Sequence, residues 1–246
     1  HTRCREVSWA RNVYKRQGVN YLIACALKSG HEYKDDWSMP GKVYAAVLPD
    51  DLSGFDEEHQ LSLQVIRENM LKNHGYYKVT EDGVEQCLIS CDDGVYRFTP
   101  PESEEQDWTV EKLVDEAASD AVLVDLDQDG EKELILISPF HGEHIYFYKK
   151  IDGDYKKVYT YDTADFAHAI YGGTLLGKPA VIIGHRKGER NLLLFTWEQE
   201  KGQYQVEILD RDCGPANVFK YERGTEEVLI STNREIDEVA MYTFEK

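Results

Sequence analysis

The chain has 246 residues, of which 46 are acidic and 28 are basic, and it carries a formal net charge of −18 at pH 7. Such an excess of carboxylates repels phosphate backbones, so the composition argues against a nucleic-acid partner. No apolar run reaches the roughly 20 residues that a membrane-spanning helix needs, and insertion into a membrane is therefore not expected.

The first 17 residues differ in charge from the rest of the chain. They contribute 5 − 1 = +4, whereas the residues from 18 onward contribute 23 − 45 = −22. Their sequence, HTRCREVSWARNVYKRQ, also resembles translated sequencing adapter. We therefore expect residues 1–17 to be a non-native or disordered leader, and the folded chain to begin at about residue 18 of a longer parent.

An apolar segment that ends in a small residue recurs along the chain. Its five copies are YLIA, CLIS, LILIS, VIIG and VLIS, which end at residues 24, 90, 138, 184 and 231. The steps between these end points are 66, 48, 46 and 47 residues, a nearly constant period after one insertion in the first step. Three further stretches of strand-like alternation accompany each copy, so that one repeat holds four strands.

Four short strands per repeat at this period are typical of propeller blades. The sequence therefore predicts an all-β fold, a partial β-propeller of about four and a half blades from a parent of about seven. The expected blade units are about 18–72, 73–118, 119–166, 167–214 and 215–246. The first unit is expected to lack its innermost strand, and the last unit to stop after its third strand.

The third repeat contains an acidic loop between two apolar strands, AVLVDLDQDGEKELILIS. Its carboxylates occupy positions 1, 3, 5 and 9, and Gly130 supplies the permissive backbone for a turn around an ion. The pattern predicts a structural Ca²⁺ site made by Asp125, Asp127, Asp129, Glu133 and the carbonyl group of Glu131. The alternative is an acidic hairpin that holds no metal.

The pattern DxDxDGxxE between β-rich segments resembles the FG-GAP or VCBS repeat of β-propellers. In that family the motif binds calcium between the first two strands of a blade. The resemblance therefore implies the same fold, the same ion and the same place for the loop in this chain.

The order of strands in a blade assigns the connecting loops to two faces. Because an antiparallel chain reverses at every turn, loops that enter a blade share a face with loops that join its second and third strands, and the acidic loop lies on the opposite face. Of the histidines after residue 17, only His59 falls outside the first face, which receives His31, His74, His141, His144, His168 and His185. The same face receives Arg186, Arg190, Arg234, Asn73, Asn217 and Asn233. A local turn hydrogen bond would explain any one of them, whereas their concentration predicts a ligand site.

Several segments along the chain resemble propeller lyases that cleave rhamnosyl-glucuronate linkages, and the propeller of aldos-2-ulose dehydratase: KNHGYYKV, GVYRFTPP, DLDQDGEKELILISPFHGEHI, FAHAIY and STNREIDE. The resemblance implies β-elimination on a uronate-containing or oxidised sugar, which needs a base and a cation that stabilises the developing charge. We predict His74 or His168 as the base, and Arg186 or Arg234 as the carboxylate clamp. The sugar would also contact Asn73, His141, His144, His185, Asn217 and Asn233.

Two alternatives remain open for the same face. Neutral imidazoles are good ligands for zinc or manganese, so the histidines could instead hold a second metal in the central funnel. The chain could also be a non-catalytic, calcium-stabilised propeller that binds glycan or protein. Trp37, Trp108 and Trp197 would then be candidates for an aromatic platform, although the last two fall in strand contexts that favour packing.

The compartment follows from two opposed observations. A calcium loop favours an extracellular site, where calcium is plentiful. The four cysteines after residue 17 have spacings that fit neither a zinc site nor a dense disulfide framework, and they favour a reducing compartment: Cys25, Cys87, Cys91 and Cys213. We expect a cytoplasmic protein with a carbohydrate ligand, with an extracellular one as the second choice, and the sequence leaves the oligomeric state open.

Overall fold

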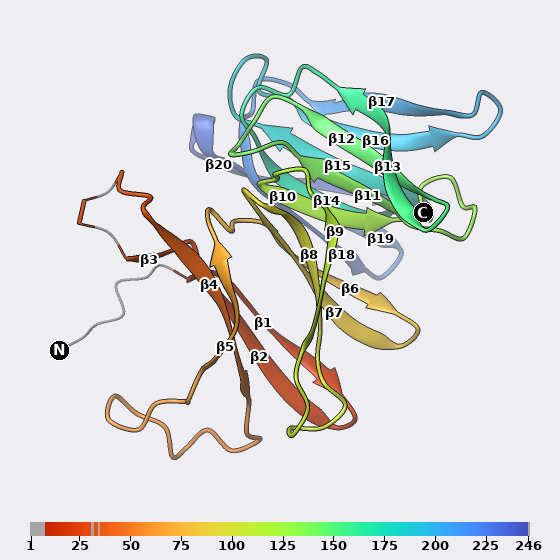
Figure 1. Cartoon of the computed structure of the whole chain (residues 1–246). Coiled ribbons are helices and arrows are strands. Elements are labelled where there is room, and N and C mark those ends of the chain that lie inside the picture. The colour runs from red at the N-terminus through yellow and green to blue at the C-terminus, as the bar shows by residue number, and fades with distance from the viewer. Residues whose placement is uncertain (1–7, 31, 34, 246) are drawn as a thin grey trace. The chain divides into compact units, whose positions relative to one another are not determined.

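The computed structural model describes residues 8–30, 32–33 and 35–245 (Figure 1). The chain divides into two compact units, His1–Ser119 and Asp120–Lys246, here called unit 1 and unit 2. Among the described residues, regular structure is β-strand apart from a single 3-10 turn, η1 (Arg234–Ile236). The same residues include no helix with the length and apolar character needed to cross a membrane. The all-β prediction is confirmed.

Unit 1 contains two antiparallel sheets. The first has the order β1-β2-β4-β3, with β5 also paired to β4: β1 (Ser8–Arg16), β2 (Val19–Ala26), β3 (Lys28–Gly30), β4 (Met39–Val47) and β5 (Gln64–Met70). The second has the order β6-β7-β8-β9: β6 (Tyr76–Glu81), β7 (Val84–Cys91), β8 (Gly94–Thr99) and β9 (Thr109–Val114).

The expectation that residues 1–17 stand outside the fold is wrong for residues 8–16. These residues form β1, which pairs with β2 and places Tyr14 opposite Tyr21. The Tyr14 side chain is fully buried, and its hydroxyl donates a hydrogen bond to the Tyr76 hydroxyl at 2.5 Å. Strand β1 therefore supplies the first strand that the first blade was expected to lack. The net positive charge of the segment did not indicate this, because strand pairing uses backbone groups. Residues 1–7, and His31, lie outside the described residues.

Unit 2 contains two four-stranded sheets and one three-stranded sheet, each in chain order. The first is β10 (Asp120–Val124), β11 (Glu133–Ile137), β12 (Ile145–Ile151) and β13 (Asp154–Tyr161). The second is β14 (Ala167–Leu175), β15 (Lys178–His185), β16 (Leu192–Glu198) and β17 (Gln203–Asp210). The third is β18 (Pro215–Arg223), β19 (Glu226–Asn233) and β20 (Glu238–Glu245).

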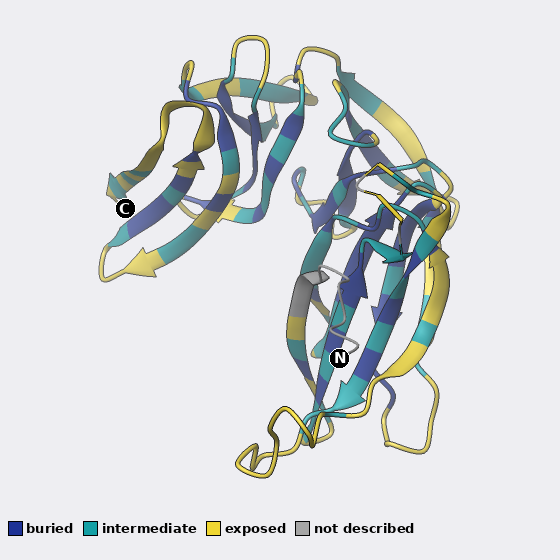
Figure 2. Ribbon diagram, turned by 90° about the vertical axis from the view of Figure 1, so that its left-hand side faces the viewer, coloured by how far each residue is buried: buried dark blue, intermediate teal, exposed yellow. Residues whose placement is uncertain are grey.

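The burial of each strand follows from its sequence pattern. Strand β11, ELILI, is buried at every position, as expected for the continuous apolar run of a strand covered on both faces. Strand β20 alternates between intermediate and exposed positions along its C-terminal half. Figure 2 shows buried stretches in the inner strands and exposed residues on outer strands and connections. The β12–β13 hairpin turns through Asp152 (φ 54°) and Gly153 (φ 91°), the positive φ pair that matches strand twist.

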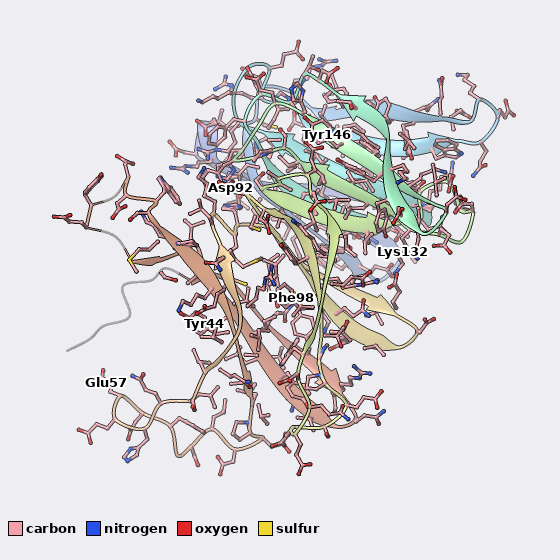
Figure 3. All side chains as sticks on the ribbon, in the orientation of Figure 1. Tyr44, Glu57, Asp92, Phe98, Lys132 and Tyr146 are labelled. Atoms are coloured by element: carbon pink, nitrogen blue, oxygen red, sulfur yellow. The ribbon has the colours of Figure 1, made fainter. Side chains whose placement is uncertain are left out.

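Unit 1 has a core of its own, and its exposed segments lie away from it. Phe98 is fully buried, whereas the β4–β5 connection is exposed from residue 49 to residue 60, where it carries Glu57 (Figure 3). Within the described residues, four cysteines are free thiols, and all four are buried: Cys25, Cys87, Cys91 and Cys213. This burial is consistent with small packing side chains.

Candidate functional site

The antiparallel sheets of unit 2 have two chemically different ends. The β10–β11 loop, residues 125–132, lies at one end, which we call the acidic end. The β11–β12 and β15–β16 connections lie at the opposite end, together with the starts of β14 and β18, because the chain reverses direction at each turn. We call this second end, which carries His141, His168, Arg186 and Arg234, the histidine end.

Backbone N–H groups of the acidic loop donate hydrogen bonds to the loop's own carboxylates and fix its conformation. The backbone N–H of Gly130 donates to Asp125 Oδ2 at 3.1 Å, and that of Glu131 donates to Asp129 Oδ1 at 2.9 Å. Gly130 has a φ of 95°, which a residue with a side chain adopts only under strain. Buried Glu133 closes the loop, because its Oε2 accepts a hydrogen bond from the Leu126 N–H at 2.7 Å.

The loop fits a hard cation. Carboxylate oxygens of Asp125, Asp127 and Glu133 lie within 4.8 Å of one another. Asp125 Oδ1 is a buried acceptor with no hydrogen-bond partner among the described residues. Burial raises the pKa of Glu133 to about 7, and the charges of Asp125 and Asp129 act in the same direction. Carboxylate oxygens held this close together are ligands of the kind that calcium takes. The Glu131 side chain is exposed, which leaves its carbonyl group as the predicted ligand.

The side chain of a lysine that the sequence analysis did not single out contacts the carboxylates of this loop. The ammonium group of Lys149, on β12, contacts Asp127 Oδ2, and its Nζ lies 3.5 Å from Glu133 Oε1 and 3.6 Å from Asp129 Oδ2. The pairing of Leu134 with Tyr148 brings it there, since Glu133 and Lys149 are the next residues along the two strands. Only the register of β11 against β12 reveals this contact.

At the histidine end, His141 and His168 form a stacked pair. Their ring centroids are 4.5 Å apart with an interplanar angle of 13°, and one nitrogen of each ring lies within 4.8 Å of the other. His168 Nδ1 lies 2.7 Å from the Ala216 carbonyl oxygen, so Nδ1 carries the proton and the lone pair belongs to Nε2. Burial lowers the pKa of His168, and the positive charges of Arg186 and Arg234 add to the effect. His168 is therefore a neutral base at pH 7.

Backbone hydrogen bonds between neighbouring connections hold this end together. The Ala167 N–H donates to the Gly142 carbonyl at 3.1 Å, and the Arg186 N–H donates to the Phe166 carbonyl at 3.1 Å. Phe166 has a φ of 58°, an uncommon conformation for a bulky residue, and its ring centroid lies 4.9 Å from that of His141. The rings therefore sit on connections that are bonded to each other.

The two arginines proposed as carboxylate clamps differ in their surroundings. Arg186 is already paired, because its Nε and a terminal nitrogen lie 2.8 and 2.6 Å from Glu235 Oε1. Its guanidinium group also lies over Phe166, 5.0 Å from the ring centroid. Arg234 is exposed, and no ion pair joins it to any residue that the structure describes. Glu235, on η1, is a second residue that the sequence analysis did not single out.

Three residues predicted to bind substrate are held inside the fold. His185 is buried: its Nδ1 lies 3.0 Å from the Lys187 carbonyl, and its Nε2 accepts a hydrogen bond from the Asn191 N–H at 3.0 Å. Asn233 is buried and donates to Glu238 Oε1 at 3.0 Å. In unit 1, the buried Asn73 donates to the carbonyls of Ala26 and Met70 at 2.6 and 2.8 Å. Both ring nitrogens of His185 and the side-chain amide nitrogens of Asn233 and Asn73 are thus used in internal hydrogen bonds.

The remaining predicted residues are more accessible. His144 pairs with Asp162, with 3.1 Å between Nδ1 and Oδ1. Asn217 is exposed on β18, and its Oδ1 accepts a hydrogen bond from the Val218 N–H at 2.9 Å. His74 lies in unit 1, in the β5–β6 connection, where its backbone N–H donates to the Ser90 carbonyl at 3.2 Å.

The aromatic platform of the alternative hypothesis is not assembled from the tryptophans. Trp108 packs edge-on against Tyr21, with 5.8 Å between ring centroids, and Trp197 packs edge-on against Tyr204 at 4.9 Å. Trp197 and Tyr204 lie on the adjacent strands β16 and β17, whereas Trp108 directly precedes β9 and contacts Tyr21 on β2, in the other sheet of unit 1. Trp37 lies under the ammonium group of Lys28, which is 4.5 Å from its ring centroid.

Repeated four-stranded antiparallel sheets define a β-propeller, and comparison with solved structures agrees with that class. The chain is similar to the intramolecular trans-sialidase of Ruminococcus gnavus in complex with oseltamivir carboxylate, with a TM-score of 0.51, 10% identity and coverage of 97% of this chain and 79% of that one. It is also similar to a putative 6-phosphogluconolactonase from Bacteroides uniformis, with a TM-score of 0.52, 13% identity and coverage of 95% and 70%. The predicted fold class, a partial β-propeller, is thereby confirmed.

A third similar structure is the leech intramolecular trans-sialidase complexed with 2,7-anhydro-Neu5Ac. Its TM-score is 0.49 at 13% identity, and the match covers 84% of this chain and 36% of the leech chain. This chain therefore spans about a third of the leech protein's length. No protein-family model matches the chain, and a search of curated proteins also finds no match.

Proposed function

We propose that the chain is part of a carbohydrate-active β-propeller that takes an anionic sugar at its histidine end. The observation that carries the proposal is the neutral His168, held by the Ala216 carbonyl and set beside the positive charges of Arg186 and Arg234. Two of the structurally similar proteins, a trans-sialidase and a putative 6-phosphogluconolactonase, carry the names of carbohydrate-processing enzymes, which supports a sugar as the ligand.

The reaction that we propose is β-elimination on a uronate-containing or oxidised sugar. His168 Nε2 takes the proton from the carbon next to the carboxylate, and the electron pair of that C–H bond becomes the new C=C bond. The glycosidic C–O bond breaks, and the leaving oxygen takes a proton from water. A guanidinium group that faces the sugar carboxylate stabilises the negative charge that develops there.

Arg234 is the better placed of the two arginines for this clamp. Arg186 already binds Glu235, with 2.6 Å between a terminal nitrogen and Oε1, so a sugar carboxylate would have to displace that contact. Arg234 is exposed and lies near enough to lower the pKa of both His168 and Glu235. We therefore assign Arg234 to the sugar carboxylate and Arg186 to positioning at this end.

The two proposed metals have separate places. Ca²⁺ would be held by Asp125, Asp127, Asp129, Glu133 and the Glu131 carbonyl, where it would tie β10 to β11. In the alternative use of the histidine end, a transition metal such as zinc or manganese would be held by His141 and His168, because these ions prefer imidazole nitrogens. It would then take the Nε2 lone pair of His168 that the lyase proposal uses as the base. Elemental analysis of the purified chain tests the second site, since His141→Ala would lower the bound zinc or manganese and Asp127→Ala would not.

The test of function uses rhamnosyl-glucuronate oligosaccharides and the ultraviolet absorbance of an unsaturated uronate. We expect the absorbance to rise with the unaltered chain and not with His168→Ala. His59→Ala is the control, because His59 is exposed on the β4–β5 connection, pairs with Asp56, and is not among the residues predicted to contact the sugar. His74→Ala tests the other predicted base. If the sugar binds without a rise in absorbance, and binding is lost in His168→Ala and Arg234→Ala, the chain is a binding module and the lyase proposal is wrong.

A further inference from the structure

We propose that Lys149 is a built-in cation of the acidic loop and competes with calcium for the same carboxylates. The inference rests on the proposal that this loop binds calcium, and it concerns how that binding is controlled. It is independent of the sugar chemistry at the histidine end, because its readout involves no sugar.

The position of the ammonium group is the first observation. Lys149 Nζ contacts Asp127 Oδ2 and lies 3.5 and 3.6 Å from oxygens of Glu133 and Asp129. Two of these three carboxylates belong to the cluster whose oxygens lie within 4.8 Å of one another. The ammonium group therefore lies at the place where an ion bound by the loop would be found.

In the third sheet of unit 2, which has no acidic loop, a lysine also pairs with a buried glutamate. Glu227, at the start of β19, is 1% exposed, and its Oε2 lies 3.0 Å from Nζ of Lys220. The same oxygen accepts a hydrogen bond from the Leu176 N–H at 2.9 Å, as Glu133 accepts one from Leu126. Lys220 is itself 6% exposed. Two buried glutamates of unit 2, Glu133 and Glu227, therefore each have a lysine ammonium group close to a carboxylate oxygen.

Calcium and the ammonium group cannot share the loop. Calcium requires about six to eight oxygen ligands at 2.3–2.6 Å, so Asp127 and Glu133 would have to turn their oxygens from Lys149 to the ion. Two positive charges a few ångströms apart also repel each other. Lys149 can leave, because its side chain is 24% exposed and is carried on a flexible four-carbon stem. Calcium binding therefore includes displacement of Lys149, which weakens the apparent affinity.

The structure also provides a spectroscopic reporter. Lys149 Nζ lies 5.1 Å from the centroid of the Trp197 ring, so an ion that replaces the ammonium group lies next to an indole. Terbium, which takes calcium sites, luminesces when a neighbouring tryptophan transfers excitation energy to it. The experiment titrates the whole chain with TbCl₃, excites tryptophan, and repeats the titration with increasing CaCl₂.

We expect Lys149→Met to bind terbium at a concentration lower by about tenfold or more than the unaltered chain does, because the competing charge is gone. Added CaCl₂ should displace terbium at correspondingly lower concentration. The matched control is Lys150→Met: Lys150 is the next residue, more exposed, and 3.9 Å from Glu131. It should titrate like the unaltered chain. Trp197→Phe should remove the luminescence and leave the melting temperature shift by calcium in place.

Equal titration midpoints for Lys149→Met and the unaltered chain would overturn the proposal, and so would the absence of sensitised luminescence from both. If Lys149→Met does not fold in chelator but folds in CaCl₂, the result supports the proposal, because calcium then replaces the missing ammonium group. If it folds under neither condition, Lys149→Gln is titrated in its place. Lys149→Gln retains a hydrogen-bond donor without the charge. Its terbium titration midpoint is then compared with that of the unaltered chain, and equal midpoints overturn the proposal.

Discussion

The two ends of unit 2 use their charged groups differently. At the acidic end, Lys149 contacts or lies near three carboxylates, and Lys220 pairs with the buried Glu227 in the third sheet. At the histidine end, Arg186 pairs with Glu235, whereas Arg234 is exposed and His168 is neutral.

The comparison distinguishes charged groups that stabilise the fold from groups that can bind or react with a ligand. Charges that are buried and paired within the fold hold strands together and have little left to offer a ligand. A neutral imidazole beside an exposed guanidinium group can still bind an anion and accept a proton. The substitutions below are chosen to test whether the two ends divide these roles as the geometry indicates.

The largest contrast is expected between His168→Ala and Asp127→Ala. The first should lower kcat/KM for a glucuronate-containing glycoside by about 10²- to 10⁴-fold, the usual contribution of a general base, with a melting temperature close to that of the unaltered chain. The second should lower the melting temperature and remove any stabilisation by added CaCl₂, with activity retained at low temperature. If each variant loses both properties, the two ends do not have separate roles.

Removing one partner of the buried ion pair in the third sheet should lower the free energy of unfolding. Glu227→Gln leaves Lys220, which is 6% exposed, without its buried partner, and should lower the free energy of unfolding by about 3–5 kcal/mol. The control is Glu222→Gln, since Glu222 is 58% exposed and 3.6 Å from the same ammonium group. It should change the free energy by about 0.5 kcal/mol or less. Urea denaturation measures both, and equal effects would contradict the structural role of Glu227.

Substitutions around the guanidinium groups should shift affinity in opposite directions. Arg234→Ala should raise KM for the uronate substrate by about tenfold, the effect of one charge-assisted contact. Glu235→Gln releases Arg186 from its carboxylate partner and should lower KM, because a second guanidinium group becomes available to the sugar. Initial rates at several substrate concentrations give both values. A higher KM in Glu235→Gln would show that Glu235 positions Arg186 for the substrate and does not compete with it.

The smallest expected effect is on the pH dependence of stability. Burial lowers the pKa of His185, so the folded chain holds this imidazole neutral while the unfolded chain protonates it near pH 6.5. The unfolded state then binds more protons below about pH 6.5, and stability falls as the pH is lowered from 7 toward 5. His168 acts in the same direction. His185→Ala should lower stability at pH 7 by about 1–3 kcal/mol through the lost hydrogen bonds and should make this slope shallower.

The sequence by itself determined the repeated β architecture and the place of the acidic loop. The period of the segments that end at Ser90, Ser138, Gly184 and Ser231 is a local property of the chain, and each of these residues lies in or directly after a buried strand. The reversal of direction at each turn then fixes which loops share an end of a sheet, so the sequence alone predicts that His141 and His168 lie at the same end.

Tertiary structure decided which side chains are engaged in ion pairs and hydrogen bonds within the fold. Sequence alone could not show that Lys149 lies in the acidic loop, that Glu235 holds Arg186, or that His185 is satisfied by two backbone groups, because these contacts depend on strand register and on the path of separate connections. The strand β1 was missed for a related reason. Its charge suggested a foreign segment, whereas its place in the fold comes from backbone pairing with β2 and from the burial of Tyr14. Composition records neither of these, since both arise only when distant parts of the chain meet.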